Sequence, residues 1–196
     1  MKPSFFTYWI ILISTVISIS ACTKINTPDQ LDSPSKSTNN IQDSSSDTLT
    51  KIQMNWTSMY PTVKDWDILK YTKNLTALTH GNIVVIESKW DKYIKRIIGM
   101  SWDTIRFSDG KVFLKKNGNN EFAELIEPFL SGSNINNTQL QSSTGDTFIL
   151  PENMYWVMGD NRQNSSDSRE CFMFCSWKDP KEHFLDRSQI LGIILQ

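Results

Sequence analysis

The fold class is decided by one stretch of the chain, Thr104-Ile105-Arg106-Phe107-Ser108-Asp109-Gly110-Lys111-Val112-Phe113-Leu114. Both of its ends are rich in β-branched and aromatic residues, which favour strands. An Asp-Gly pair between two such runs is a strong signal for a tight hairpin turn, because both residues tolerate positive φ. The stretch therefore predicts two antiparallel strands.

Further segments with the same composition lie on either side of this hairpin and are bounded by turn residues. They are residues 82–86, 93–98, 147–150, 155–158 and 190–194. Helical periodicity is limited to a turn or two around Trp66–Lys73 and Asn120–Phe129. Short strands at close spacing predict a mostly β, antiparallel fold with few short helices.

The composition excludes several classes of function. The 196 residues carry 20 Lys and Arg against 21 Asp and Glu, a formal charge of −1, so a nucleic-acid partner is not expected. A hydrophobic content of 39% is enough to bury a core and excludes full disorder. Three cysteines and two histidines disfavour both a disulfide-stapled miniprotein and a structural zinc cluster.

The first 22 residues are expected to form an export or anchor segment. No charged side chain lies between Pro3 and Thr23, and Lys2 gives a positive flank, as in a transmembrane anchor or an export signal. The run Ile19-Ser20-Ala21-Cys22 resembles the lipobox of bacterial lipoproteins, in which the cysteine is lipidated and becomes the new N-terminus. The alternative is a signal-anchor helix that ends in Ala-Cys. In both cases the rest of the chain is expected on the outer side of a bacterial membrane and tethered to it.

Residues 23–50 are rich in Ser, Thr, Asn, Asp and Pro and contain no aromatic residue. Such a segment cannot bury enough apolar surface to offset the entropy of ordering, so we expect a flexible linker. Order is expected to begin near Lys51. The predicted organisation is an export or anchor segment (1–22), a linker (23–50) and a folded domain (51–196).

Lys95 is a candidate general base. An amine acts as a base only when it is neutral, which requires desolvation or a nearby positive charge. Lys95 lies in a run that is apolar apart from itself and Arg96. On a strand these two side chains point to opposite faces, so one could be buried and the other solvated. Two exposed basic residues would be the simpler interpretation of this run alone. Neither His80 nor His183 has a context typical of a catalytic histidine.

Three segments of the chain, one of which contains Lys95, favour a catalytic role for this residue. They are Trp56-Thr57-Ser58-Met59-Tyr60-Pro61-Thr62, Tyr93-Ile94-Lys95-Arg96-Ile97-Ile98-Gly99-Met100-Ser101-Trp102-Asp103 and Gly159-Asp160-Asn161-Arg162-Gln163-Asn164-Ser165-Ser166-Asp167-Ser168-Arg169. In this order they resemble the three signature boxes of bacterial type I signal peptidases, which are membrane-bound serine endopeptidases with a Ser–Lys dyad. The resemblance spans roughly residues 51–196. It implies an antiparallel β-sheet peptidase domain of the signal peptidase I type.

The resemblance also implies roles for particular residues. Ser58 would be the nucleophile, and Lys95 the general base that takes its proton. Ser165 would orient the lysine amine by a hydrogen bond. Asp167 and Arg169 would pair and hold the third box against the site.

Substrate binding and partners follow from the same resemblance. Met59 would line the substrate groove, and the backbone N–H of Ser58 would form part of the oxyanion hole. The expected substrates are exported preproteins, from which the N-terminal signal peptide is removed, and the enzyme would contact membrane lipid. The chemistry requires no metal and no organic cofactor.

Three positions depart from the family pattern. Trp56 stands where some relatives have a hydroxyl residue that completes the oxyanion hole, so the hole would rely on backbone, water or Thr57. Trp102 replaces a glycine in a tight turn, and a positive φ there would cost roughly 1 kcal/mol or more, so a local change of backbone shape is expected. Asn82 replaces an aspartate away from the dyad. The altered turn at Trp102, together with the lipobox, motivates an alternative function, a dedicated processing peptidase for one secretion or conjugation substrate.

Cys171 and Cys175 follow the third box directly. Outside the cytoplasm a disulfide that closes this small loop is one expectation, and two free or buried thiols are the other.

A different class of function, a catalytically silent lipoprotein that keeps the fold as a binding module, is the remaining alternative. The presence of Ser58, Lys95 and Ser165 argues against it.

Overall fold

The computed structural model describes residues 49–88, 91–140, 145–173 and 179–196. All of them belong to one compact unit, Asp43–Gln196. The predicted anchor or lipoprotein segment, nearly all of the predicted linker, and Cys175 lie outside the described residues. No helix among the described residues has the length and apolar character needed to cross a bilayer.

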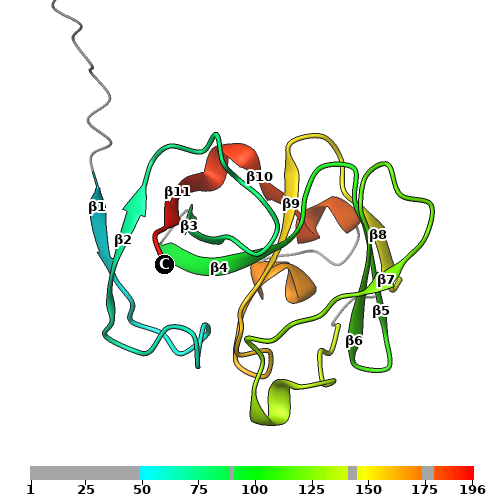
Figure 1. The fold of residues 1–196 in the computed structure, drawn as a ribbon, viewed down its shortest axis with the longest axis horizontal. Helices are drawn as coiled ribbons and strands as arrows, with labels where there is room; N and C mark the ends of the chain where they lie inside the picture. The colour runs from blue at the N-terminus through cyan, green and yellow to red at the C-terminus, as the bar shows by residue number, and fades with distance from the viewer. Residues whose placement is uncertain (1–48, 89–90, 141–144, 174–178) are drawn as a thin grey trace, which may run out of the picture. The chain divides into compact units, whose positions relative to one another are not determined.

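Two antiparallel sheets form the unit (Figure 1). The larger has the strand order β1-β2-β11-β3-β4-β9-β10. Its strands are β1 (Thr50–Gln53), β2 (Ile68–Thr72), β3 (Ile83–Glu87), β4 (Lys92–Gly99), β9 (Met154–Met158), β10 (Leu185–Asp186) and β11 (Ile190–Ile194). The smaller has the order β7-β6-β5-β8. It consists of β5 (Thr104–Ser108), β6 (Lys111–Lys115), β7 (Ala123–Glu124) and β8 (Thr147–Ile149).

The predicted fold class is confirmed. Each of the seven segments predicted as strands is a strand, with bounds that differ by at most one residue. The hairpin pairs β5 with β6 and places Ser108 opposite Lys111. Helical structure in the described residues consists of 3₁₀ segments only: η1 (Gly132–Asn134), η2 (Ser168–Met173), η3 (Pro180–His183) and η4 (Arg187–Gln189).

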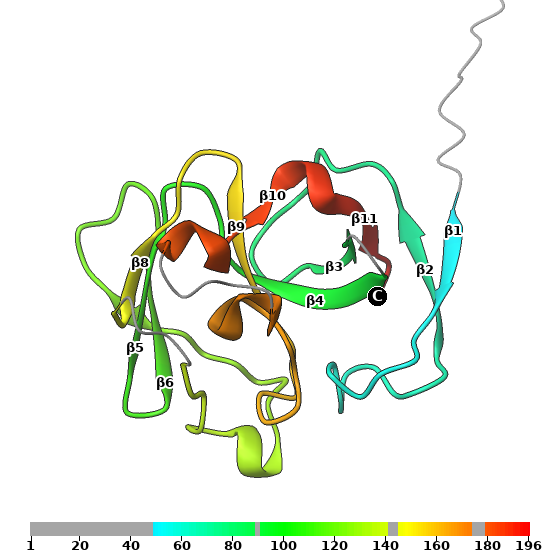
Figure 2. The ribbon, with the colours of Figure 1, turned by 180° about the vertical axis from the view of Figure 1, so that it is seen from behind.

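The two predicted helical turns are wrong. Residues 68–72 form β2, which pairs with both β1 and β11. Residues 123–124 form β7, which pairs with β6. The strand β7 is at the edge of the smaller sheet and β2 is next to the edge of the larger one. In both, pairing with neighbouring strands satisfies the backbone and overrides local helical propensity. Figures 1 and 2 show β1 and β2 at one end of the unit and the smaller sheet at the other.

The larger sheet is buried on both faces, which explains the continuous apolar runs of its central strands. On β3, Ile83 and Val85 belong to a cluster with Met54, Met59 and Ile94. The other two buried residues of β3, Val84 and Ile86, belong to a second cluster, whose further members are Ile97, Tyr155, Val157, Leu185, Ile190 and Ile193. A third cluster joins the two sheets through Ile98, Ile105, Phe107, Val112, Leu114, Phe148, Leu150, Trp156 and Met158.

The turn between β4 and β5 keeps a positive φ at the unusual tryptophan. Trp102 has φ 71° and is 53% exposed. The turn is fixed by a hydrogen bond from Trp102 N to Leu150 O (2.8 Å) and by Asp103, whose carboxylate accepts from Met100 N (2.8 Å). The expectation that the backbone avoids a positive φ by a local change of shape is therefore not met, and Trp102 adopts a conformation that is disfavoured for a residue with a β-carbon.

Candidate active site

Ser58 and Lys95, which lie 37 residues apart in the sequence, meet in the folded structure. Ser58 lies in the loop that joins β1 to β2, and Lys95 lies on the central strand β4. The Nζ of Lys95 is 2.9 Å from the Oγ of Ser58. Both residues are buried, with 2% and 7% of their surface exposed for Lys95 and Ser58. The two residues that the sequence predicts as catalytic are thus in hydrogen-bond contact.

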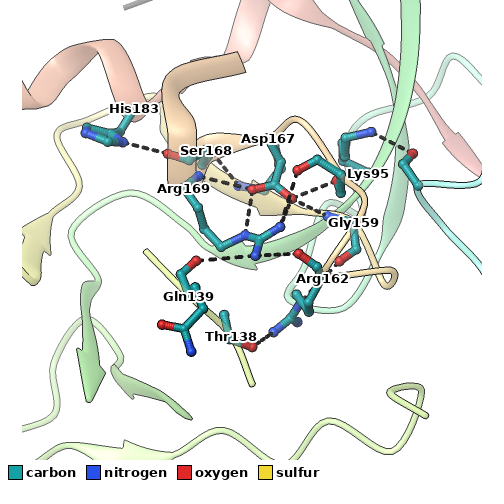
Figure 3. A network of polar contacts seen from close by, with 12 residues as sticks. Lys95, Thr138, Gln139, Gly159, Arg162, Asp167, Ser168, Arg169 and His183 are labelled. Atoms are coloured by element: carbon teal, nitrogen blue, oxygen red, sulfur yellow. Dashed lines mark hydrogen bonds and ion pairs between the residues drawn. The ribbon is translucent and has the colours of Figure 1, made fainter. Parts of the chain in front are cut away.

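The surroundings of the Lys95 amine favour its neutral form. Burial lowers the pKa of Lys95 from 10.5 to about 8, and the charges of Asp167 and Asp160 offset only part of this effect. The other polar contact of Nζ is the carbonyl oxygen of Ile94 (3.2 Å). Within the described part of the chain no carboxylate pairs with Lys95, and Figure 3 shows its amine pointing away from Asp167.

A pocket with a cavity volume of about 280 Å³ opens beside the two residues. Its lining combines apolar walls with a few polar groups: Met54, Trp56, Thr57, Ser58, Asp91, Tyr93, Ile94, Lys95, Asn164, Ser166 and Phe172. Met59 is not part of this lining. Its side chain is fully buried in the cluster under the loop, because the residue after Ser58 turns inward. The assignment of Met59 to the groove is therefore corrected, and Met54 lines the pocket instead.

The loop that carries Ser58 is held by the third sequence box. The N–H of Asn161 donates to the carbonyl oxygen of Ser58 (3.0 Å), and its side-chain amide donates to the carbonyl oxygen of Thr57 (3.1 Å). A β-carbon at Gly159 would collide with the Ser58 carbonyl oxygen and the Ser165 hydroxyl. Glycine is therefore required where the two backbones approach so closely. Within the described residues the N–H of Ser58 itself donates no hydrogen bond, so it is available to a bound group.

Asp167 is the centre of the network that fixes this box (Figure 3). It is fully buried and pairs with Arg169 (2.9 Å), as the sequence predicts. Its carboxylate also accepts from Gly159 N (2.9 Å) and Ser165 Oγ (2.8 Å). Burial alone would raise the pKa of Asp167, but the charge of Arg169 and these hydrogen bonds hold it below its ordinary value.

Ser165 does not make the hydrogen bond expected from the sequence. Its single hydroxyl proton goes to Asp167, whereas Lys95 contacts Ser58 and the Ile94 carbonyl oxygen. A carboxylate is a stronger acceptor than an amine for a buried hydroxyl. Ser165 therefore supports the site through Asp167 and through its packing against Gly159.

Sequence reasoning missed the role of Arg96. Both Lys95 and Arg96 are buried, so the expectation that one of them could be solvated is wrong. Arg96 donates two hydrogen bonds to Asp160 (2.9 and 2.7 Å). Asp160 is fully buried and also accepts from Thr62 Oγ1 (2.5 Å). The available signal for this pair was one arginine in the second box and one aspartate in the third, since buried residues of opposite charge are expected to pair.

The histidines have structural contacts. His80 Nε2 lies 2.6 Å from Asp103 in the β4–β5 turn. His183 is buried, contacts the carbonyl oxygen of Ser168 (2.6 Å) and stacks on Trp156 with ring centroids 5.6 Å apart. Burial lowers the pKa of His183. In the part of the chain that the structure describes, no group of three His, Cys, Asp or Glu side chains could hold a metal ion.

Cys171 is buried and forms a disulfide. The other two cysteines of the chain, Cys22 and Cys175, are outside the described residues. The specific pairing of Cys171 with Cys175 therefore stays a prediction.

The fold and the site define a class of protein, a two-sheet antiparallel β domain that brings a serine hydroxyl against a buried lysine amine. In chemical terms this arrangement is a nucleophile beside a general base. The family model described as signal peptidase, peptidase S26 matches residues 45–195. The chain belongs to this family.

Individual relatives agree with this assignment. The chain is 38% identical over 120 residues to signal peptidase I T of Bacillus subtilis (strain 168), which covers 57% of this chain and 59% of that protein. It is 32% identical over 129 residues to signal peptidase IB of Staphylococcus aureus (strain Mu50 / ATCC 700699), covering 57% and 63%. These matches span about three fifths of the length of the relatives.

A solved structure is also similar. It is a signal peptidase I from Enterococcus faecalis V583, at 23% identity and a TM-score of 0.45, and the match covers 62% of this chain and all of that one.

Proposed function

We propose that this chain is a membrane-tethered serine endopeptidase that removes N-terminal signal peptides from exported preproteins with a Ser58–Lys95 dyad. The observation that carries the proposal is the 2.9 Å contact between the two side chains at the edge of the pocket. Membership of the signal peptidase family and the names of the relatives, all signal peptidases, support the choice of substrate.

The reaction follows from the two protonation states of Lys95. The neutral amine accepts the hydroxyl proton of Ser58 while Oγ attacks the scissile carbonyl carbon. The N–H of Ser58 donates to the oxyanion of the tetrahedral intermediate, a contribution worth about 3 kcal/mol at comparable sites. Lys95 then returns the proton to the leaving amine. Water hydrolyses the resulting acyl-enzyme by the same proton route.

The ion pairs around the dyad have positioning roles in this proposal. Asp167 and Arg169 fix the third box, and Asn161 of that box holds the Ser58 loop. Substrate would bind in an extended conformation, with backbone hydrogen bonds giving affinity. A membrane tether would concentrate enzyme and preprotein in one plane and so raise their effective concentration.

The proposal is tested with the full chain in detergent or vesicles and a preprotein that carries a signal peptide. Ser58→Ala and Lys95→Ala should each abolish release of the mature protein, while far-UV circular dichroism stays that of the wild type. Matched controls are Ser108→Ala and Lys70→Ala, whose residues lie exposed on strands β5 and β2. Retained cleavage in either dyad variant would overturn the dyad, and no cleavage by the wild type would overturn the activity.

The tether is tested separately by intact-mass analysis of the protein extracted from membranes. Lipid attachment at Cys22 predicts a chain that starts at this residue and carries acyl chains. A chain that still starts at Met1 or Lys2 would replace the lipoprotein with a transmembrane anchor.

A further inference from the structure

Phe172 is an apolar wall of the catalytic pocket that the mechanism above does not use. It lines the pocket together with Ser58 and Lys95. It also packs against the apolar cluster on one face of the larger sheet. Lys95 is on the same face, because it pairs with Val84 of that cluster and lies two residues before Ile97, whose side chain points to the same side of the strand. The ring of Phe172 thus lies between the core of the sheet and the space beside the dyad.

The backbone that presents this ring adopts an unusual conformation. Cys171 has φ 50° and ψ 39°, and Phe172 has φ 53° and ψ 29°. Two consecutive left-handed residues with β-carbons are disfavoured and persist only where the surroundings impose them. Such strain is concentrated at functional sites.

Two restraints hold this segment in the described structure. The N–H of Phe172 donates to the carbonyl oxygen of Asp167 (3.0 Å), which connects it to the network behind the dyad. The neighbouring Cys171 is buried and disulfide-bonded. A covalent link at the residue before Phe172 restricts the positions that the ring can take.

We propose that Phe172 is a specificity-determining residue that limits the size of the substrate side chain accepted beside Ser58, and that the disulfide of Cys171 keeps its ring in the pocket. This inference rests on the proposed function and adds a determinant for its substrate range. Because Phe172 lies outside both sheets, its truncation enlarges the pocket without removing a strand or a dyad residue. Cys171 is a positioning residue that acts through Phe172.

The disulfide makes this size limit sensitive to reduction. A dithiol such as dithiothreitol gives two electrons and two protons to the disulfide, which becomes two thiols, and the dithiol closes to a cyclic disulfide. The covalent restraint is then lost and the strained pair can relax. We expect the reduced protein to accept larger side chains, as a variant that lacks the ring does.

The test compares two peptide substrates that differ only in the residue before the scissile bond, alanine or leucine. The readout is the ratio of kcat/KM for the leucine peptide to that for the alanine peptide. Phe172→Ala should raise this ratio by about tenfold or more, as expected when space for a few methylene groups is opened. Phe172→Leu should raise it less. Phe122→Ala is the matched control, because Phe122 stacks on Arg106 at the smaller sheet (4.2 Å), and it should leave the ratio unchanged.

The role of the disulfide is tested by epistasis. Cys171→Ser, and reduction of the wild type by dithiothreitol, should both raise the ratio. In the double variant Cys171→Ser/Phe172→Ala the ratio should equal that of Phe172→Ala, and dithiothreitol should not change it. An unchanged ratio in Cys171→Ser and in the reduced wild type would overturn the role of the disulfide.

A binding assay separates failure of this inference from failure of the proposed function. The affinity of both peptides is measured by fluorescence anisotropy in the Ser58→Ala background, with and without Phe172→Ala. If the wild type does not hydrolyse the peptides but Phe172→Ala improves binding of the leucine peptide selectively, the pocket inference stands and the proposed function falls. If hydrolysis occurs and neither Phe172 variant changes the ratio, the inference about Phe172 falls alone.

Discussion

Lys95 and Arg96 are neighbours on one strand and are buried to a similar degree, 2% and 6% exposed. The hydrogen-bond partners of their two cationic groups nevertheless differ in charge. Arg96 meets the carboxylate of Asp160 through two hydrogen bonds and the carbonyl oxygen of Gly81 through a third (2.8 Å). Lys95 meets a hydroxyl and one carbonyl oxygen. One buried cation is fully paired, whereas the other is left with neutral partners.

This difference separates a structural cation from a base. A buried guanidinium cannot lose its proton, so it requires a carboxylate, and the resulting pair joins two segments of the chain. A buried amine with neutral partners becomes easier to deprotonate, since desolvation penalises only its charged form. The third box contributes a carboxylate near each residue. Asp160 pairs with Arg96, whereas Asp167 pairs with Arg169 and not with Lys95.

The strongest way to break the comparison is to make the two residues alike. Lys95→Arg keeps a cation at the position but removes any neutral form at accessible pH. We expect kcat/KM for a signal-peptide substrate to fall by about 10³-fold or more, the scale of losing a general base and its alignment. Lys70→Arg on β2 is the control and should have wild-type activity. Activity within tenfold of the wild type in Lys95→Arg would contradict a lysine base.

A second change removes the partner of the other cation. Asp160→Asn leaves Arg96 buried beside a neutral amide, and breaking a buried pair from one side costs about 3–5 kcal/mol. We expect the free energy of unfolding, measured by urea titration, to fall by this amount. The exposed carboxylate of Asp109 provides the control Asp109→Asn, with an expected change of about 0.5 kcal/mol or less. A loss below 1 kcal/mol in Asp160→Asn would show that the pair is not structurally important.

The pH dependence of the reaction sharpens the comparison without a mutation. With a lysine pKa lowered to about 8, the protonated amine dominates below pH 8 and the neutral base dominates above it. The rate constant kcat/KM should therefore rise about tenfold per pH unit well below 8, roughly fiftyfold from pH 6 to 8, and level off above. Circular dichroism over the same range controls for unfolding. A flat profile from pH 6 to 10 would not be compatible with Lys95 as the base.

The smallest expected effect concerns the turn at the end of the strand that carries both residues. Trp102→Gly relieves the positive φ of 71°, and we expect the protein to gain about 1 kcal/mol of stability. Lys116→Gly, at an exposed turn residue outside the positive-φ set, should instead destabilise by about 0.5–1 kcal/mol. If the two substitutions change the urea midpoint in the same direction, strain at Trp102 is not the reason for the effect.

The strands could be predicted where local composition and burial agree. Val84 and its neighbours on β3 are buried on both faces, so their apolar run was visible in the sequence. The strand β2 was missed because Ile68 and Lys70 are exposed, and its pairing with β11 is fixed by residues more than 100 positions away. A strand with an exposed face depends on partner strands that a local pattern does not contain.

The site could be predicted in part from its three boxes. The resemblance of these boxes to those of signal peptidases identified Ser58 and Lys95, and implied the pairing of Asp167 with Arg169. The hydrogen bond of Ser165 and the inward position of Met59 could not be read from spacing. The first depends on whether Asp167 or Lys95 accepts the hydroxyl proton of Ser165. The second depends on whether the side chain of Met59 packs in the core or lines the pocket.

Burial lowers the pKa of the Lys95 amine to about 8, and no carboxylate among the described residues pairs with it directly to reverse this effect. The most direct measurement is a ¹³C NMR titration of the protein labelled at the lysine ε-carbons, with the Lys95 signal assigned by its absence in Lys95→Arg. A titration midpoint near 8 is expected for this signal. A midpoint at the ordinary lysine value of 10.5 would contradict it.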